Sequence, residues 1–115
     1  MGAAKFDITI AQGSDFQFVV TVVGGPASLS GYVGAMQIRQ IKSSSPALYD
    51  VPSNAIVVDN GTRQVTVTLP WTETVDFDWD GGLYDLVIES ADGLHRPRLA
   101  EGRVSVDHSV TRAAA

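Results

Sequence analysis

The stretch AIVVDNGTRQVTVTL (residues 55–69) predicts two antiparallel strands joined by a tight turn. Val65, Val67 and Leu69 alternate with threonines, so their apolar side chains fall on one face of a pleated strand. Asn60-Gly61 supplies the positive φ angles that a short hairpin turn requires, and it is the strongest local turn signal in the chain. The expected strands of this hairpin are 55–59 and 63–69.

The same period of two recurs along the rest of the chain. Phe16, Phe18 and Val20 fall on one face of their expected strand, and Tyr84 and Leu86 fall on one face of theirs. No apolar pattern of helical period persists for three turns. The other expected strands are 5–11, 15–23, 32–41, 46–50, 83–90, 94–100 and 102–108.

Three local signals qualify this strand pattern. Gln12-Gly13-Ser14 separates the first two strands and indicates either a hairpin or a strand break. Pro97 cannot donate a ladder hydrogen bond, so a strand at 94–100 is expected to lie at an edge or to be bulged. A single helical turn is expected at Thr72–Phe77, where a strand ends near Pro70.

Seven to nine short strands with frequent turns indicate an all-β, antiparallel β-sandwich, with a small β-barrel as the alternative. Gly82-Leu83-Tyr84-Asp85-Leu86 favours an immunoglobulin-like sandwich. Such domains place a tyrosine corner here, with the ring in the core and the hydroxyl bonded to backbone upstream. The alternative is that Tyr84 is only another inward aromatic. Strand parity also predicts that Phe18, Val20, Met36, Ile38 and Leu86 face the space between the sheets.

Length and composition restrict the class of protein. The 115 residues are enough for one domain, expected over 1–108 with a short tail at 109–115. With 8 basic and 13 acidic residues the net charge is −5, which argues against nucleic acid and anionic membranes as partners. The absence of cysteine excludes disulfides and thiolate-bound metals. No apolar run approaches the ~20 residues of a membrane helix, and no secretory signal follows Lys5.

Catalytic chemistry finds little support in the residues. His95 and His108 are the only histidines, and no Gly-x-Ser-x-Gly elbow is present. Ser105 and Asp107 lie near His108 in sequence, but no pattern places that histidine as a base. We therefore expect no enzyme activity and no cofactor.

Asp76-Phe77-Asp78-Trp79-Asp80-Gly81 reproduces the D-x-D-x-D-G opening of a calcium loop. Hard cations require several oxygens from alternate positions, and Asp76, Asp78 and Asp80 are therefore the candidate metal ligands. The bidentate glutamate of such a loop would fall at Val87, inside an expected strand. The alternative is a solvated acidic turn with Phe77 and Trp79 packed beneath it. The flanking tryptophans, Trp71 and Trp79, either stack on sugar rings or seal one end of the core.

The charges separate into two groups along the sequence. Opposed patches on one molecule suit a head-to-tail contact between copies, which closes into a ring when the rotation permits. The first strand lacks a proline that would block edge pairing, so Phe6 and Ile8 are also expected at an interface. The alternative is a mixed, solvated surface. The basic group is Arg96, Arg98 and Arg103, and the acidic group is Glu73, Asp76, Asp78 and Asp80.

Seven segments in a characteristic order cover about residues 5–112. They are Phe6-Asp7-Ile8-Thr9-Ile10-Ala11-Gln12-Gly13, Leu29-Ser30-Gly31-Tyr32 running into Ala35-Met36-Gln37-Ile38-Arg39, Asn60-Gly61, Thr72-Glu73-Thr74, Gly82-Leu83-Tyr84-Asp85-Leu86, Gly102-Arg103-Val104-Ser105-Val106, and Val110-Thr111-Arg112. In combination they resemble a family of small bacteriophage virion proteins, encoded among head, tail and baseplate genes. The chain is more distantly similar to the N-terminal β-sandwich of upper-baseplate proteins in lactococcal phages.

The resemblance implies a structural role in the tail, baseplate or neck of a virion, as a β-sandwich present in several copies that attaches or supports fibres. It implies other virion proteins and further copies of the chain as partners, and assembly in the cytoplasm of a host bacterium. It implies no catalytic residues. A stand-alone carbohydrate- or calcium-binding adhesion module is the alternative function.

Overall fold

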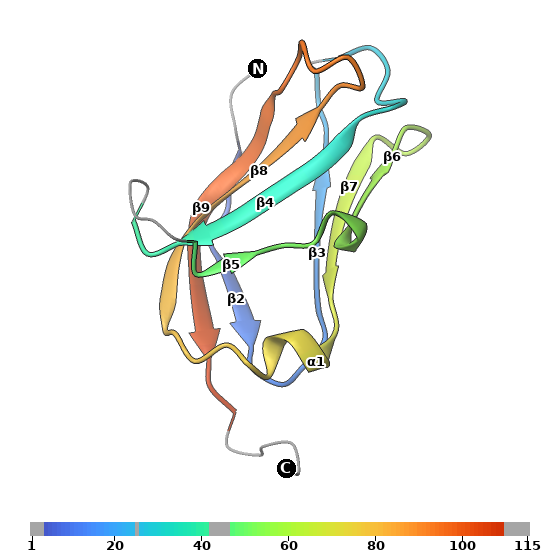
Figure 1. Ribbon diagram of the computed structural model, residues 1–115. Helices are drawn as coiled ribbons and strands as arrows, with labels where there is room; N and C mark the ends of the chain where they lie inside the picture. Colours follow the sequence, from blue (N-terminus) through green and yellow to red (C-terminus); the bar gives the residue numbers. More distant parts are fainter. Residues whose placement is uncertain (1–3, 25, 42–46, 110–115) are drawn as a thin grey trace.

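The computed structural model describes residues 4–24, 26–41 and 47–109, which form two packed β-sheets (Figure 1). One sheet has the strand order β1-β9-β8-β4-β5, with β2 also paired to β9, and the other has the order β3-β7-β6. The predicted β-sandwich is confirmed. The strands are β1 Ala4–Lys5, β2 Ile8–Ala11, β3 Phe16–Thr21, β4 Val33–Arg39, β5 Tyr49–Asp50, β6 Ile56–Asp59, β7 Gln64–Leu69, β8 Gly81–Glu89 and β9 Arg98–Asp107.

The core lies between the two sheets and follows the predicted alternation. Val65 and Val67 on β7 are fully buried, as are Ile38 on β4 and Leu86 on β8. Phe18 is partly buried and packs against this core. The side-chain register inferred from the period of two is therefore confirmed, because each strand turns its apolar parity toward the other sheet.

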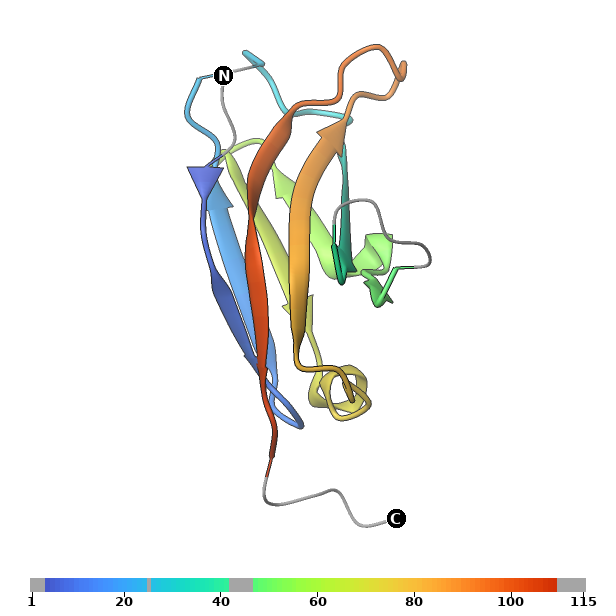
Figure 2. The ribbon, with the colours of Figure 1, turned by 90° about the vertical axis from the view of Figure 1, so that its left-hand side faces the viewer.

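The chain changes sheets between β2 and β3 (Figure 2). Residues Ile8–Ala11 pair with β9 in parallel, whereas β3 pairs antiparallel with β7 in the other sheet. The segment Gln12–Ser14 is thus a strand break, and the hairpin alternative is wrong. Parallel pairing of β1 and β2 with β9 is also the exception to the antiparallel pairing expected of the sandwich.

Strands predicted at 94–100 and 102–108 are wrong as separate elements. A single strand, β9, runs from Arg98 to Asp107, and residues 90–97 connect it to β8. Pro97 takes part through its carbonyl, which accepts a hydrogen bond from the Ile88 amide at 3.1 Å. Gly102 is no break either: a Cβ there would overlap the carbonyl oxygen of Phe6, so glycine permits close approach of two backbones.

The β6–β7 hairpin is confirmed, but its turn differs from the predicted one. The turn comprises the four residues 60–63, and the positive φ falls on Arg63, at 56°, and not on Asn60-Gly61. The Arg63 guanidinium donates to the carbonyl oxygens of Gly24 and Pro26, both at 2.8 Å, and so ties this turn to the β3–β4 connection.

Two short elements complete the sandwich. The helical turn expected at Thr72–Phe77 is found as α1, which spans Trp71–Thr74 and so begins and ends earlier than expected, directly after Pro70. A separate 3-10 turn lies at Ser53–Ala55, between β5 and β6. Strand β5 covers only Tyr49–Asp50 of the predicted 46–50. Residue 46 and most of the predicted tail, 110–115, lie outside the described residues.

Tyr84 is an inward aromatic whose hydroxyl bonds backbone far upstream. The side chain is buried, and its Oη donates to the Phe6 carbonyl oxygen at 2.7 Å. The bond therefore does not close a local corner beside β8. It fixes the segment between β1 and β2, which the parallel pairing brings next to β9.

Candidate functional site

An open groove of about 520 Å³ lies on the outer face of the six-stranded sheet. Its walls come from β1, β4, β8 and β9 and from the connections beside them. We call it the outer groove. It is lined by Lys5, Asp7, Gln37, Arg39, Leu83, Tyr84, Asp85, Arg96, Arg98, Glu101, Gly102 and Arg103.

The strand register builds the floor of the outer groove in rows across the sheet. One row consists of Arg39, Leu83 and Arg103 on β4, β8 and β9. The neighbouring row brings Asp85 opposite Glu101, and Glu101 opposite Lys5. Since alternate residues of a strand share a face, both rows point away from the core.

The outer groove concentrates positive charge on an acidic protein. Five of the eight lysines and arginines of the chain line it, together with three carboxylates. The net charge of the groove residues is therefore +2. Since the whole chain has a net charge of −5, all other residues together carry −7. The groove is therefore positively charged on a protein whose remaining residues are negative overall.

Most of these cations are held by neighbouring side chains. Arg98 lies 3.5 Å from Asp85 and 3.5 Å from Glu101, measured between nitrogen and carboxylate oxygen. Arg96 lies 3.9 Å from Glu89, outside the groove lining. These partners reduce the charge that Arg96 and Arg98 can offer to another molecule.

Arg103 and Lys5 are different, because within residues 4–24, 26–41 and 47–109 neither side chain has an ion-pair or hydrogen-bond partner. Only the backbone amide of Arg103 is bonded, donating to Asp7 Oδ1 at 3.0 Å. Within the described residues, the groove thus retains two cations whose side chains form no ion pair.

The structure brings three of the predicted interface residues together, since Arg96, Arg98 and Arg103 all line the outer groove. Phe6 is 46% exposed, as a contact residue must be, but Ile8 is buried in the core and its assignment to an interface is wrong. The inward register of β2 explains this, because Ile8 shares its parity with Ile10. Sequence analysis missed Lys5 and Arg39, which β1 and β4 supply.

The predicted metal ligands lie in the loop after α1. Asp76, Asp78 and Asp80 are exposed, and Asp80 Oδ1 lies 2.9 Å from Nε2 of His108. Val87, where a calcium loop would have its glutamate, is buried in β8. Over the part of the chain that the structure describes, no three acidic, histidine or cysteine side chains gather closely enough to hold a metal ion.

A chelator is therefore expected to leave the melting temperature unchanged, because the loop lacks the oxygens that would complete a calcium shell. The measurement is thermal unfolding with and without EDTA, with Asp78→Ala as the paired variant. A clear drop in melting temperature with EDTA that disappears in the variant would contradict this expectation.

Two buried polar side chains hold the acidic loop in place, and sequence analysis found neither. Gln12 Nε2 donates to the carbonyl oxygens of Val75 at 3.3 Å and Phe77 at 2.9 Å. Thr74 Oγ1 donates to the Ser14 carbonyl oxygen at 2.8 Å. No local pattern signals this clamp, since Gln12 lies more than sixty positions from its partners.

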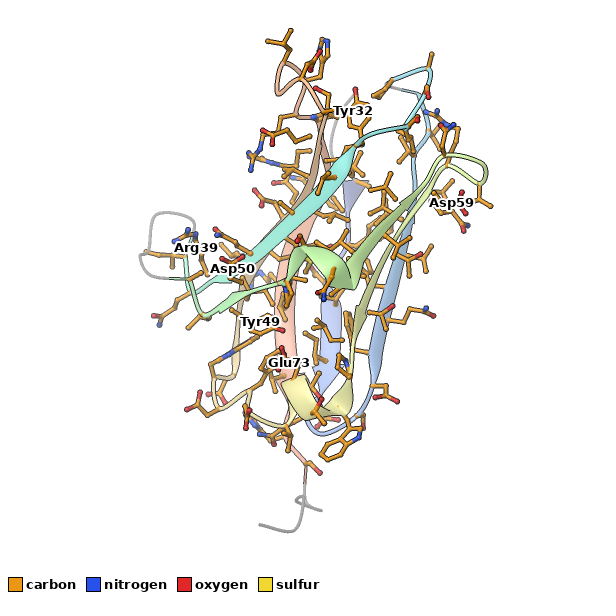
Figure 3. All side chains as sticks on the ribbon, turned by 45° about the vertical axis from the view of Figure 1, so that its right-hand side comes forward. Tyr32, Arg39, Tyr49, Asp50, Asp59 and Glu73 are labelled. Carbon is orange, nitrogen blue, oxygen red and sulfur yellow. The ribbon has the colours of Figure 1, made fainter. Side chains whose placement is uncertain are left out.

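An aromatic cluster underlies the same loop. Phe77 is buried, with ring centroids 4.7 Å from Tyr49 and 4.9 Å from Trp79. The Tyr49 hydroxyl donates to Glu73 at 3.2 Å, as the orientation of the two side chains in Figure 3 shows. Burial and the Glu73 carboxylate raise the pKa of Tyr49 to about 12. Trp79 is partly buried and packs against the core, whereas Trp71 is 46% exposed.

A solved structure with a similar fold identifies the type of sandwich. The chain is similar to the extracellular domain of the voltage-gated sodium channel beta4 subunit, described as a parallel homodimer with a role in cell–cell adhesion. The TM-score is 0.55 at 12% identity, over 96% of this chain and 97% of that one. At this identity the likeness shows the fold alone, and the fold is an immunoglobulin-like β-sandwich.

No protein-family model matches the chain, and a search of curated proteins finds no match. Within the described residues, no helix has both the length and the hydrophobicity needed to cross a membrane.

Proposed function

We propose that the chain is a non-enzymatic structural protein of a bacteriophage virion, located in the tail, baseplate or neck. It mediates assembly or attachment of fibres through contacts with other virion proteins and with further copies of itself. The quoted segments from Phe6–Gly13 to Val110–Arg112, which resemble small virion proteins, support the virion setting.

The observation that carries a binding role is the outer groove. Small-molecule sites are usually enclosed and mainly apolar, with few polar groups. This groove is open and is lined mostly by charged side chains on a paired sheet. Such a surface suits recognition of another protein by charge complementarity, which favours specific and rapid association.

The alternative, a carbohydrate-binding adhesion module, is favoured by one observation. Trp71 is large, exposed and two residues from Glu73, an arrangement that can stack on a sugar ring. Binding on a glycan array that Trp71→Ala abolishes would support this alternative.

Mass spectrometry of particles purified from a lysate that contains this gene product tests the proposal. We expect peptides of the chain to co-sediment with known virion proteins in a constant ratio through a density gradient. A chain that is abundant in the lysate but absent from the particles would refute the virion role.

A further inference from the structure

We infer that the outer groove receives the acidic loop of a second copy of the chain. The acidic loop is defined as residues 75–80, which carry Asp76, Asp78 and Asp80. This inference rests on the part of the proposed function that places several copies together. It specifies which two surfaces meet.

The groove side of the contact centres on Arg103. Arg39 and Arg103 flank Leu83 in one row across three strands, so their backbones lie ~10 Å apart at the usual strand spacing. Arg98, in contrast, is held by Asp85 and Glu101. Arg103 therefore carries a charge that no described side chain holds, with Leu83 beside it as an apolar floor, and Lys5 stands in the neighbouring row opposite Glu101.

The loop side presents matching carboxylates. Asp76 and Asp78 are exposed, and within the described ranges their side chains have no ion-pair or hydrogen-bond partner. Asp80 is already bonded to His108. Two unpaired carboxylates, two residues apart, thus complement the two unpaired cations Arg103 and Lys5.

Both surfaces are ordered before they meet. Gln12 holds the loop backbone at Val75 and Phe77, Thr74 fixes the residue before the loop, and the Phe77 side chain is anchored in the core. The groove residues stand on paired strands. Association of such surfaces loses little conformational entropy, so even a modest electrostatic gain favours binding.

The positions of the two surfaces set the kind of assembly. The acidic loop lies at the α1 end of the sandwich, opposite the 90–97 connection (Figures 1 and 2). The outer groove, in contrast, is lined by residues on the face of the six-stranded sheet. Different patches therefore meet, which gives a head-to-tail contact that forms rings or open chains. Because the charges are solvent-exposed, the contact is weak in the free protein and sensitive to salt.

Two charge reversals test the pairing. In Arg103→Glu the groove carries an acidic residue at the contact and meets a loop that is also acidic. In Asp78→Lys the loop carries a basic residue and meets a groove that is also basic. Sedimentation velocity measures self-association up to about 1 mM protein, the range of a weak contact. Each variant alone is expected to associate at least ~10-fold more weakly than the wild type.

An equimolar mixture of the two variants is expected to recover association. The Arg103→Glu groove then faces a basic loop, and the Asp78→Lys groove faces a native loop. Matched controls carry the same changes in net charge on the opposite face. Gln17 and Thr21, both exposed on β3, are changed together to glutamate or to lysine, and these variants are expected to associate like the wild type.

Three results would overturn the inference: a wild type that stays monomeric at low salt, variants that associate as the wild type does, or a mixture that associates no better than its components. Circular dichroism and a melting curve for each variant show that it is folded, so a loss of association reports the contact. Such a failure leaves the virion role intact, since that role is tested by the composition of purified particles.

Discussion

Replacing Leu86 with alanine is expected to lower the free energy of unfolding by about 2–5 kcal/mol, the range for a buried leucine that leaves a cavity. Leu86 has no exposed surface and lies on β8, between β4 and β9 in the six-stranded sheet. Its neighbours are held by strand pairing on both sides, so the space left by the missing methyl groups closes only in part. The measurement is the urea unfolding curve.

Val57→Ala is the matched control. Val57 is 59% exposed on the edge strand β6, and an exposed substitution is expected to change stability by no more than about 0.5 kcal/mol. An unchanged unfolding midpoint for Leu86→Ala would show that the inward face of β8 is assigned wrongly.

Gly102→Ala is expected to destabilise the protein by about 1–3 kcal/mol, the usual range for a group forced into filled space. The added Cβ would overlap the Phe6 carbonyl oxygen, so the backbone at Phe6 must move away from β9. That movement also stretches the hydrogen bond from Tyr84 Oη and the bond from the Phe6 amide to Glu101. The unfolding midpoint and faster hydrogen exchange at the Phe6 amide both report the change.

Two further variants separate these effects. Ser105→Ala, at an exposed position of β9, is expected to leave stability nearly unchanged. Tyr84→Phe removes only the hydroxyl, so the Phe6 carbonyl oxygen loses the hydrogen bond from Tyr84 Oη. The free energy of unfolding is expected to fall by about 1 kcal/mol. If Gly102→Ala were as stable as the wild type, the N-terminal segment would not lie against β9.

The stability and the contact surface of this protein depend on different residues. Leu86 and Gly102 face the core or a neighbouring backbone, whereas Arg103 and Asp78 are exposed. Charge reversals in the outer groove and the acidic loop should therefore leave the sandwich folded. This separation allows self-association to be tested without loss of the fold.

The sequence by itself predicted most of the strands, favoured the sandwich over a barrel and determined the inward parity of residues such as Val65 and Ile38, but it divided β9 into two strands. It also determined the helical turn after Pro70 and the buried position of Tyr84. All of these follow from local physical chemistry: the two-residue period of a strand, the missing amide of proline and the burial of apolar side chains. These features can be predicted from residues that are close together in the sequence.

Only the tertiary structure decided which strands pair and which side chains meet. The parallel pairing of β2 with β9 joins segments almost a hundred residues apart, and the change of sheet at Gln12–Ser14 also depends on the pairing of β3 with the distant strand β7. Pairing of β1, β8 and β4 across the same sheet brings Lys5 and Arg39 into one groove with Arg103, and the change of sheet after β2 places Gln12 against the acidic loop. A period of two predicts which face of a strand a side chain lies on. Which strands pair with one another depends on hydrogen bonding and packing between segments that are far apart in the sequence.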